Sequence, residues 1–169
     1  LLYYGMETGD DATLKAVNKG VDGEQAVEAG RRVTASGMKL SMMIILGLAG
    51  AEGSERHALA TAKAINIIKP THLSALCLML YRGSELLDQY EAGKFNPLSP
   101  AGLMRELKLI IENIDLPADR HCLFRSNHVS NYVQLAATLP HDKQRLLRDI
   151  DYSIAQLSKL KSWDVYNYN

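Results

Sequence analysis

The sequence predicts an α/β fold: a partial, TIM-like (βα) barrel fragment with about three parallel strands, crossover helices and a C-terminal helix. Three observations support this prediction. Residues 39–46 are nearly all apolar, which is typical of a parallel strand buried on both faces. Two further short apolar runs, residues 1–6 and 71–80, stand before and after it. Segments with apolar residues at helical spacing separate the three runs, and this alternation favours a parallel sheet with right-handed connections.

The predicted helices begin and end at residues with known positional preferences. Asp22 followed by Gln25 resembles a capping box, and Ser54 is expected to cap the next long helix. Ser99-Pro100 opens a further helix, with proline at the first helical position. The expected helices cover approximately residues 10–19, 22–36, 54–69, 84–92, 99–116 and 141–161.

The chain divides by character at about residue 117. Residues 1–116 contain the βα units, whereas residues 117–169 form an irregular polar segment followed by the terminal helix. The chain begins at Leu1, inside an apolar run and without an initiator methionine, so we expect a fragment of a longer protein. We also expect the run at residues 1–6 to be an unpaired strand edge, through which the chain self-associates or at which it is partly disordered.

The composition of the chain argues against three classes of partner, namely nucleic acid, membrane and metal ions. Lys+Arg and Asp+Glu both number 19, and this balance gives no electrostatic reason to expect nucleic acid. No apolar run approaches the ~20 residues that a membrane span requires, so no membrane partner is expected. Cys77 and Cys122 lie far apart, without the spacing of a disulfide framework or a metal site. We therefore expect a cytoplasmic protein with no metal ligands in this chain.

Candidate binding residues follow the strands, because ligands of parallel α/β folds sit beyond the carboxyl ends of the strands. These positions are Glu7 and Thr8, residues 47–53 and residues 81–85. A carboxylate such as that of Glu7 suits ribose hydroxyls or an ammonium group. The alternative is that Glu7 simply favours a helix N-terminus.

Several segments, in order and separation, resemble the radical S-adenosylmethionine (SAM) superfamily. Residues 4–10 and 14–20 resemble its fourth strand and helix, with the pattern Tyr-Gly-Met-Glu-Thr-Gly-Asp and then Asn-Lys-Gly at residues 18–20. Residues 44–50 resemble the fifth strand, and residues 70–86 resemble the sixth strand with its loop. Residues 122–132 are similar to the tail of an Fe–S oxidoreductase-like subgroup.

The resemblance implies roles for five residues. Glu7 would contact the ribose or aminoacyl part of SAM, and Thr8 stands where the family usually has serine. Lys19 would bind the methionine carboxylate. Ile45 and Gly47 would offer an apolar edge and an open backbone to the adenine. For Lys19 the alternative is a solvated residue near a helix end, and for Ile45 and Gly47 it is core packing and a turn.

The resemblance also implies an activity for the intact protein. It would bind a [4Fe–4S] cluster and SAM, cleave SAM reductively to the 5′-deoxyadenosyl radical, and act on a further substrate. The three-cysteine cluster loop of the family is absent from this sequence, so we expect no catalytic residue in this chain and no activity from it alone. The alternative is a non-catalytic α/β binding or assembly module. The polar segment Arg125–Tyr132 has two interpretations, the lining of a substrate mouth or a surface loop.

Overall fold

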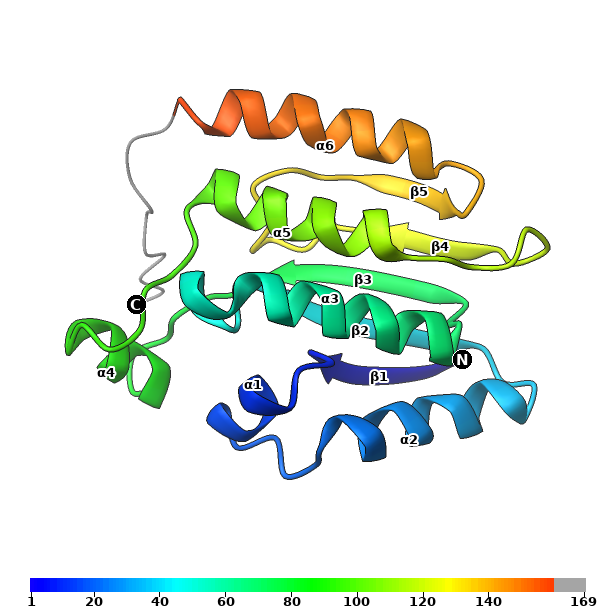
Figure 1. Cartoon of the computed structure of the whole chain (residues 1–169), viewed down its shortest axis with the longest axis horizontal. Helices are drawn as coiled ribbons and strands as arrows, with labels where there is room; N and C mark the ends of the chain where they lie inside the picture. Colours follow the sequence, from blue (N-terminus) through cyan, green and yellow to red (C-terminus); the bar gives the residue numbers. More distant parts are fainter. Residues whose placement is uncertain (160–169) are drawn as a thin grey trace.

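The structure of the chain, a computed structural model, describes residues 1–159 as one sheet with helices beside it (Figure 1). The strands are β1 (Leu2–Glu7), β2 (Leu40–Leu46), β3 (His72–Cys77), β4 (Cys122–Arg125) and β5 (Ala136–Leu139). The helices are α1 (Asp11–Ala16), α2 (Gly23–Ala35), α3 (Gly50–Ile68), α4 (Glu85–Glu91), α5 (Pro100–Asn113) and α6 (Lys143–Leu157). The last two residues of the predicted terminal helix, 160 and 161, lie outside the described residues.

The strands lie in the order β1-β2-β3-β4-β5. The first four are parallel, and β5 runs antiparallel to β4. The predicted α/β class and parallel sheet are confirmed. The segment that we expected to be irregular instead contributes β4 and β5, so the described sheet has two strands more than predicted. Each has only four residues, and two of the four in β5 are alanine, which is depleted in strands; neither run is long enough to show a clear alternation.

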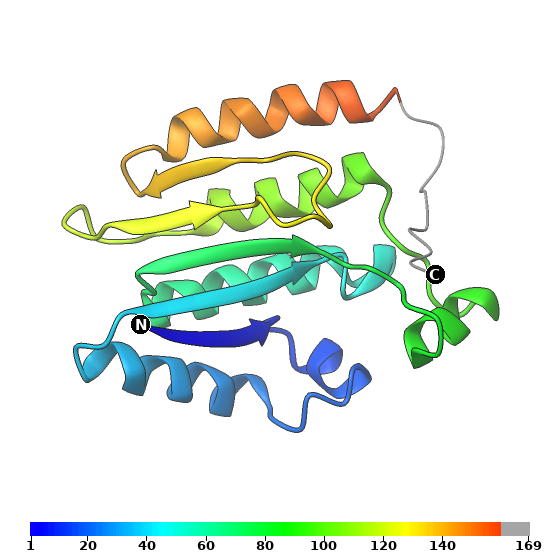
Figure 2. The ribbon, with the colours of Figure 1, turned by 180° about the vertical axis from the view of Figure 1, so that it is seen from behind.

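The sheet has one covered face and one open face. Figure 2, seen from behind, shows the strands in front of helices α3 and α5. In β2, Met42, Ile44 and Leu46 are buried beneath the helices, whereas Met43 and Ile45 are only partly buried. The expectation that this strand is buried on both faces is therefore wrong for residues 1–159. The register places the following residues on the open face, all of them at least partly exposed except Ser41: Tyr3, Gly5, Ser41, Met43, Ile45, His72, Ser74, Leu76, Leu123, Arg125, Ala136 and Thr138.

One hydrophobic core joins the two halves of the chain. Ile65 of α3 and Leu107 of α5 are fully buried against the sheet, and so are Phe124 of β4 and Ile150 of α6. Burying such a side chain contributes about 1.5–3 kcal/mol, which fastens the C-terminal segment to the βα units. Among the described helices, none is both long and apolar enough to cross a membrane.

The helix ends agree with the sequence at most caps. The capping box of α2 is present, with the Gln25 N–H donating to Asp22 at 2.8 Å and the Asp22 N–H donating to Gln25 at 3.1 Å. The predicted start of α3 at Ser54 is wrong, because this helix begins at Gly50. The hydroxyl of Ser54 instead bonds to Glu106 across the core.

Candidate functional site

The carboxyl end of β1 turns the side chain of Glu7 back over the open face. Glu7 has φ of 65°, and the pairing of β1 with β2 shifts between Gly5 and Glu7. A Cβ atom at Gly5 would lie 2.5 Å from Oε1 of Glu7. Gly5 therefore has to be glycine for the carboxylate to occupy this position, which explains the Gly-Met-Glu pattern physically.

Lys19 lies beside this carboxylate. It comes from the loop after α1, and its Nζ donates to Oε1 of Glu7 at 3.0 Å. The side chains are 29% and 23% exposed, respectively. An ion pair of this exposure stabilises a fold by only about 0–1 kcal/mol, so a ligand can separate or share it at little cost.

Ile45 shares the open face with Glu7 and Lys19. It pairs in register with Leu76, and the neighbouring Met43 pairs with Gly5. All are partly exposed on this side of the sheet. The structure thus brings three of the five predicted site residues to one face: a carboxylate, an ammonium group and an apolar edge.

The other two predicted residues lie beneath the helices. Thr8 is fully buried; its hydroxyl accepts from the Asp10 N–H at 3.0 Å and bonds to Nδ1 of His57 at 2.7 Å. The N–H of Gly47 is occupied by Oε1 of Glu106 at 2.6 Å. Neither residue offers a free polar group to the open face.

Glu106 is the centre of a buried polar network that was not predicted from the sequence. It is 2% exposed and binds both Gly47 and the hydroxyl of Ser54, the latter at 2.5 Å. Burial raises the pKa of Glu106 to about 7 and lowers the pKa of His57 to about 4. Between these values both groups are neutral, so the 3.6 Å approach of His57 Nε2 to Glu106 Oε1 joins two uncharged groups. One signal was available: Glu106 lies on the apolar face of α5, where an acid is unusual.

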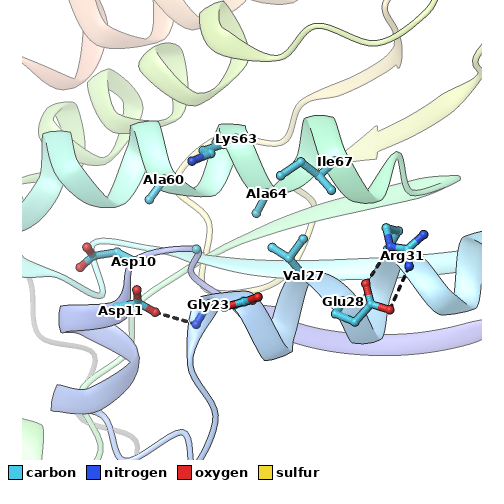
Figure 3. Close-up of a pocket in the computed structure, with 12 residues that line it drawn as sticks. Asp10, Asp11, Gly23, Val27, Glu28, Arg31, Ala60, Lys63, Ala64 and Ile67 are labelled. Atoms are coloured by element: carbon cyan, nitrogen blue, oxygen red, sulfur yellow. Dashed lines mark hydrogen bonds and ion pairs between the residues drawn. The ribbon is translucent and has the colours of Figure 1, made fainter.

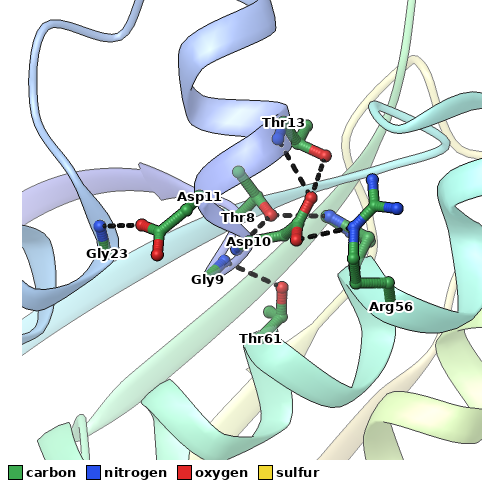
Figure 4. Close-up of polar contacts among 9 residues, drawn as sticks. Thr8, Gly9, Asp10, Asp11, Thr13, Gly23, Arg56 and Thr61 are labelled. Atoms are coloured by element: carbon green, nitrogen blue, oxygen red, sulfur yellow. Dashed lines mark hydrogen bonds and ion pairs between the residues drawn. The ribbon is translucent and has the colours of Figure 1, made fainter.

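A second network holds the turn after β1 against α3 (Figure 4). Asp10 accepts from the Thr13 N–H at 2.9 Å, as the N-cap of α1, and from Arg56 Nε at 2.8 Å. Burial acts to raise the pKa of Asp10, but the hydrogen bonds from Arg56 and Thr13 outweigh it and hold that pKa below its usual range. The Gly9 N–H donates to Thr61 at 3.0 Å. These contacts hold Gly9 and Asp10 against α1 and α3, and so fix the chain directly after Glu7.

The two cysteines are both in the core. Cys77 is 4% and Cys122 0% exposed, and burial raises the pKa of each thiol to about 12. Thiols with such a pKa stay protonated and do not bind metal, because the metal ligand is the thiolate. Within residues 1–159 no group of three or more His, Cys, Asp or Glu side chains is arranged to hold a metal ion. The residues present do not fit an iron–sulfur cluster.

A hollow of about 640 Å³ lies on the helical side, between α2 and α3 (Figure 3). Its apolar floor includes Val27, Ala64 and Ile67, and the Glu28–Arg31 ion pair at 2.7 Å stands at its rim. It is separated from Glu7 by the sheet. The hollow therefore does not belong to the open-face site.

Comparisons with known proteins show a shared fold. No family model matches the sequence, and no curated protein matches it in sequence. The structure of the archaeal Methanocaldococcus infernus Elp3 with an N-terminal deletion (1–46) is similar, with a TM-score of 0.61 and 15% sequence identity. The match covers 92% of this chain and 36% of the Elp3 chain, so this chain spans about a third of that protein. This chain has the α/β fold of a partial barrel. At this identity the likeness extends to the fold alone.

Proposed function

We propose that this chain forms part of the SAM-binding barrel of a radical SAM enzyme. The proposal is supported by the sequence resemblance and by the partial-barrel fold shared with Elp3, a radical SAM family member. The observation that carries it is the Glu7–Lys19 pair on the open face, 3.0 Å apart at the carboxyl end of β1.

The charges of this pair complement the methionyl part of SAM, which bears an ammonium and a carboxylate. The Glu7 carboxylate can accept from the ligand ammonium or from ribose hydroxyls, and the Lys19 ammonium can donate to the ligand carboxylate. Only Oε1 of Glu7 and one N–H of Lys19 are used within residues 1–159. Oε2 and two N–H groups therefore remain for a ligand, and Ile45 supplies an apolar surface beside them.

The proposal assigns the cluster ligands to a part of the enzyme outside this chain. When bound beside a reduced cluster, SAM is the source of the radical chemistry of this superfamily. The residues of this chain would bind and orient SAM. We therefore expect the chain alone to bind SAM without cleaving it.

The test is a binding titration of the chain with S-adenosylhomocysteine, followed by ¹H–¹⁵N NMR. We expect saturable shifts around residues 5–8 and 18–20, and at least tenfold weaker binding for Glu7→Gln and for Lys19→Met. Glu28→Gln is the matched control, because Glu28 is likewise ion-paired, with Arg31, but lies on α2. Equal weakening by Glu28→Gln, or no binding to the unaltered chain at millimolar ligand, would contradict the proposal.

A further inference from the structure

Arg125, the last residue of β4, is a cation on the open face that has no anionic partner among the described residues. The preceding residue, Phe124, is fully buried beneath the helices, so the alternation of the strand turns Arg125 to the other side. The residue is exposed, and its register partners are Ser74 and Ala136. One guanidinium N–H donates to the carbonyl of Phe124 at 2.7 Å, and no carboxylate within residues 1–159 pairs with the group. Four of its five N–H donors are thus free.

The rest of this face, as far as the described strands form it, supplies no acid to neutralise Arg125. Apart from Glu7, which is engaged with Lys19, the side chains that the described strands place there are uncharged or histidine. In water an exposed guanidinium needs no partner. When a bound ligand excludes water from the guanidinium, the ligand has to supply a counter-charge, because a desolvated charge without one is strongly unfavourable.

The loop after β4 is held firmly beside Arg125. Asn131 donates to the carbonyl of Ala75 at 2.8 Å, and the Cys77 N–H donates to Ser130 at 3.1 Å and to Asn131 at 3.2 Å. The loop therefore continues the pairing of β3 where β4 has ended. These side chain–backbone contacts anchor residues 130 and 131 of the loop to β3, a few residues after Arg125 in the chain.

His128 is such a residue. Its Nδ1 accepts the N–H of Ser130 at 3.2 Å, so the neutral ring carries its proton on Nε2. The loop does not use this second nitrogen in any hydrogen bond within the described residues, and the side chain is exposed. The Nε2–H of His128 is thus a hydrogen-bond donor, three residues along the chain from the guanidinium of Arg125.

We propose that the open face binds a small molecule bearing a carboxylate or phosphate group, with Arg125 as the principal anion-binding residue and His128 as a second donor. The planar fork of arginine matches both oxyanions. Gly5, Met43, Ser74 and Arg125 lie in one row across β1 to β4. At about 4.8 Å per strand, the row spans about 14 Å between the first and last backbones. A molecule anchored at Arg125 can therefore extend along the row toward Glu7.

This inference rests on the proposed function in one respect, which is that the anionic molecule would be the substrate of SAM-dependent chemistry. The anion site itself depends on Arg125 and its surroundings. The two ideas can therefore fail separately.

The experiment titrates the chain with sodium acetate and, separately, with sodium phosphate, at constant ionic strength maintained with chloride. NMR follows the backbone of residues 74–77 and 125–131 and the Nε–H of Arg125. We expect saturable shifts, at least tenfold weaker binding for Arg125→Gln, and an intermediate affinity for Arg125→Lys, which keeps the charge but loses the fork. Arg148→Gln is the control, because Arg148 is an exposed arginine on α6. Whichever anion binds more tightly identifies the chemical group.

Each outcome decides the matter. Loss of binding in Arg125→Gln with retention in Arg148→Gln supports the site. Shifts that do not saturate, or equal weakening by the two variants, overturn it. Retained backbone shifts elsewhere show that each variant is folded. Anion binding without binding of S-adenosylhomocysteine at Glu7 would leave the anion site standing and remove its assignment to SAM chemistry.

Discussion

Replacement of Glu106 by glutamine tests the buried network that joins α5 to the end of β2 and to α3. Glutamine retains an oxygen for the N–H of Gly47 and gains an amide that can donate to the hydroxyl of Ser54, but it does not titrate. The carboxyl of Glu106 has a pKa of about 7 in the folded chain, against 4.5 for an unperturbed glutamate. The folded state thus binds this proton more tightly than the unfolded state does.

The sign of the effect follows from that difference. The stability contributed by protonated Glu106 is fully present below about pH 4.5 and is lost as the pH rises through about 7. His57 acts in the opposite direction: its pKa falls from 6.5 to about 4, so its contribution is present above 6.5 and is lost as the pH falls through 4. Between pH 4.5 and 6.5 the two dependences largely cancel. The unaltered chain should therefore show a flat stability profile there.

Glu106→Gln removes the pH dependence that Glu106 contributes and leaves that of His57. Glu106 is only 2% exposed and its pKa is raised to about 7, so between pH 5 and pH 8 the unaltered chain should lose about 2–3 kcal/mol of unfolding free energy relative to the variant. Urea unfolding at several pH values measures it. Glu112→Gln is the control, since Glu112 is on the same helix but exposed.

A charged Glu106–His57 pair would give the opposite result. If Glu106 and His57 formed a charged pair, Glu106→Gln would leave a buried cation and would destabilise the chain by about 3–5 kcal/mol near neutral pH. A loss of that kind, or a difference that does not change with pH, would refute the reasoning.

Two further changes test the rest of the fold. In Gly9→Ala the new Cβ would collide with the backbone carbonyl of Ala60, so we expect a loss of about 1–3 kcal/mol in urea unfolding; an unchanged midpoint would show that the turn after β1 can move. The N–H of Tyr3 points away from β2, so Tyr3→Pro should abolish self-association through the β1 edge without breaking the sheet. Tyr3→Ala, which keeps that N–H, should still associate in sedimentation equilibrium, and association of both variants alike would exclude this edge.

The order of elements was predictable because local rules determine it. The apolar run before Gly47, the capping box at Asp22 and the proline at position 100 place strands and helices through residues close in sequence. The four-residue strands β4 and β5 were missed because β4 pairs with β3, which is distant in the chain, and β5 in turn pairs with β4. Ser54 was misassigned as a cap because its partner, Glu106, lies 52 residues away.

The sequence by itself determined that Glu7 and Thr8 lie at the carboxyl end of a strand, that Lys19 follows a helix, and that Arg125 lies in a polar segment. It did not determine which side of the sheet each residue faces, because a shift of one residue reverses the face of a strand side chain. Only the tertiary structure decided which side of the sheet these residues face. The irregular end of β1 turns Glu7 over Gly5 toward the open face and leaves Thr8 beneath the helices. The pairing of β4 with β3 turns Arg125 toward the open face as well, because side chains opposite one another in a sheet lie on the same face.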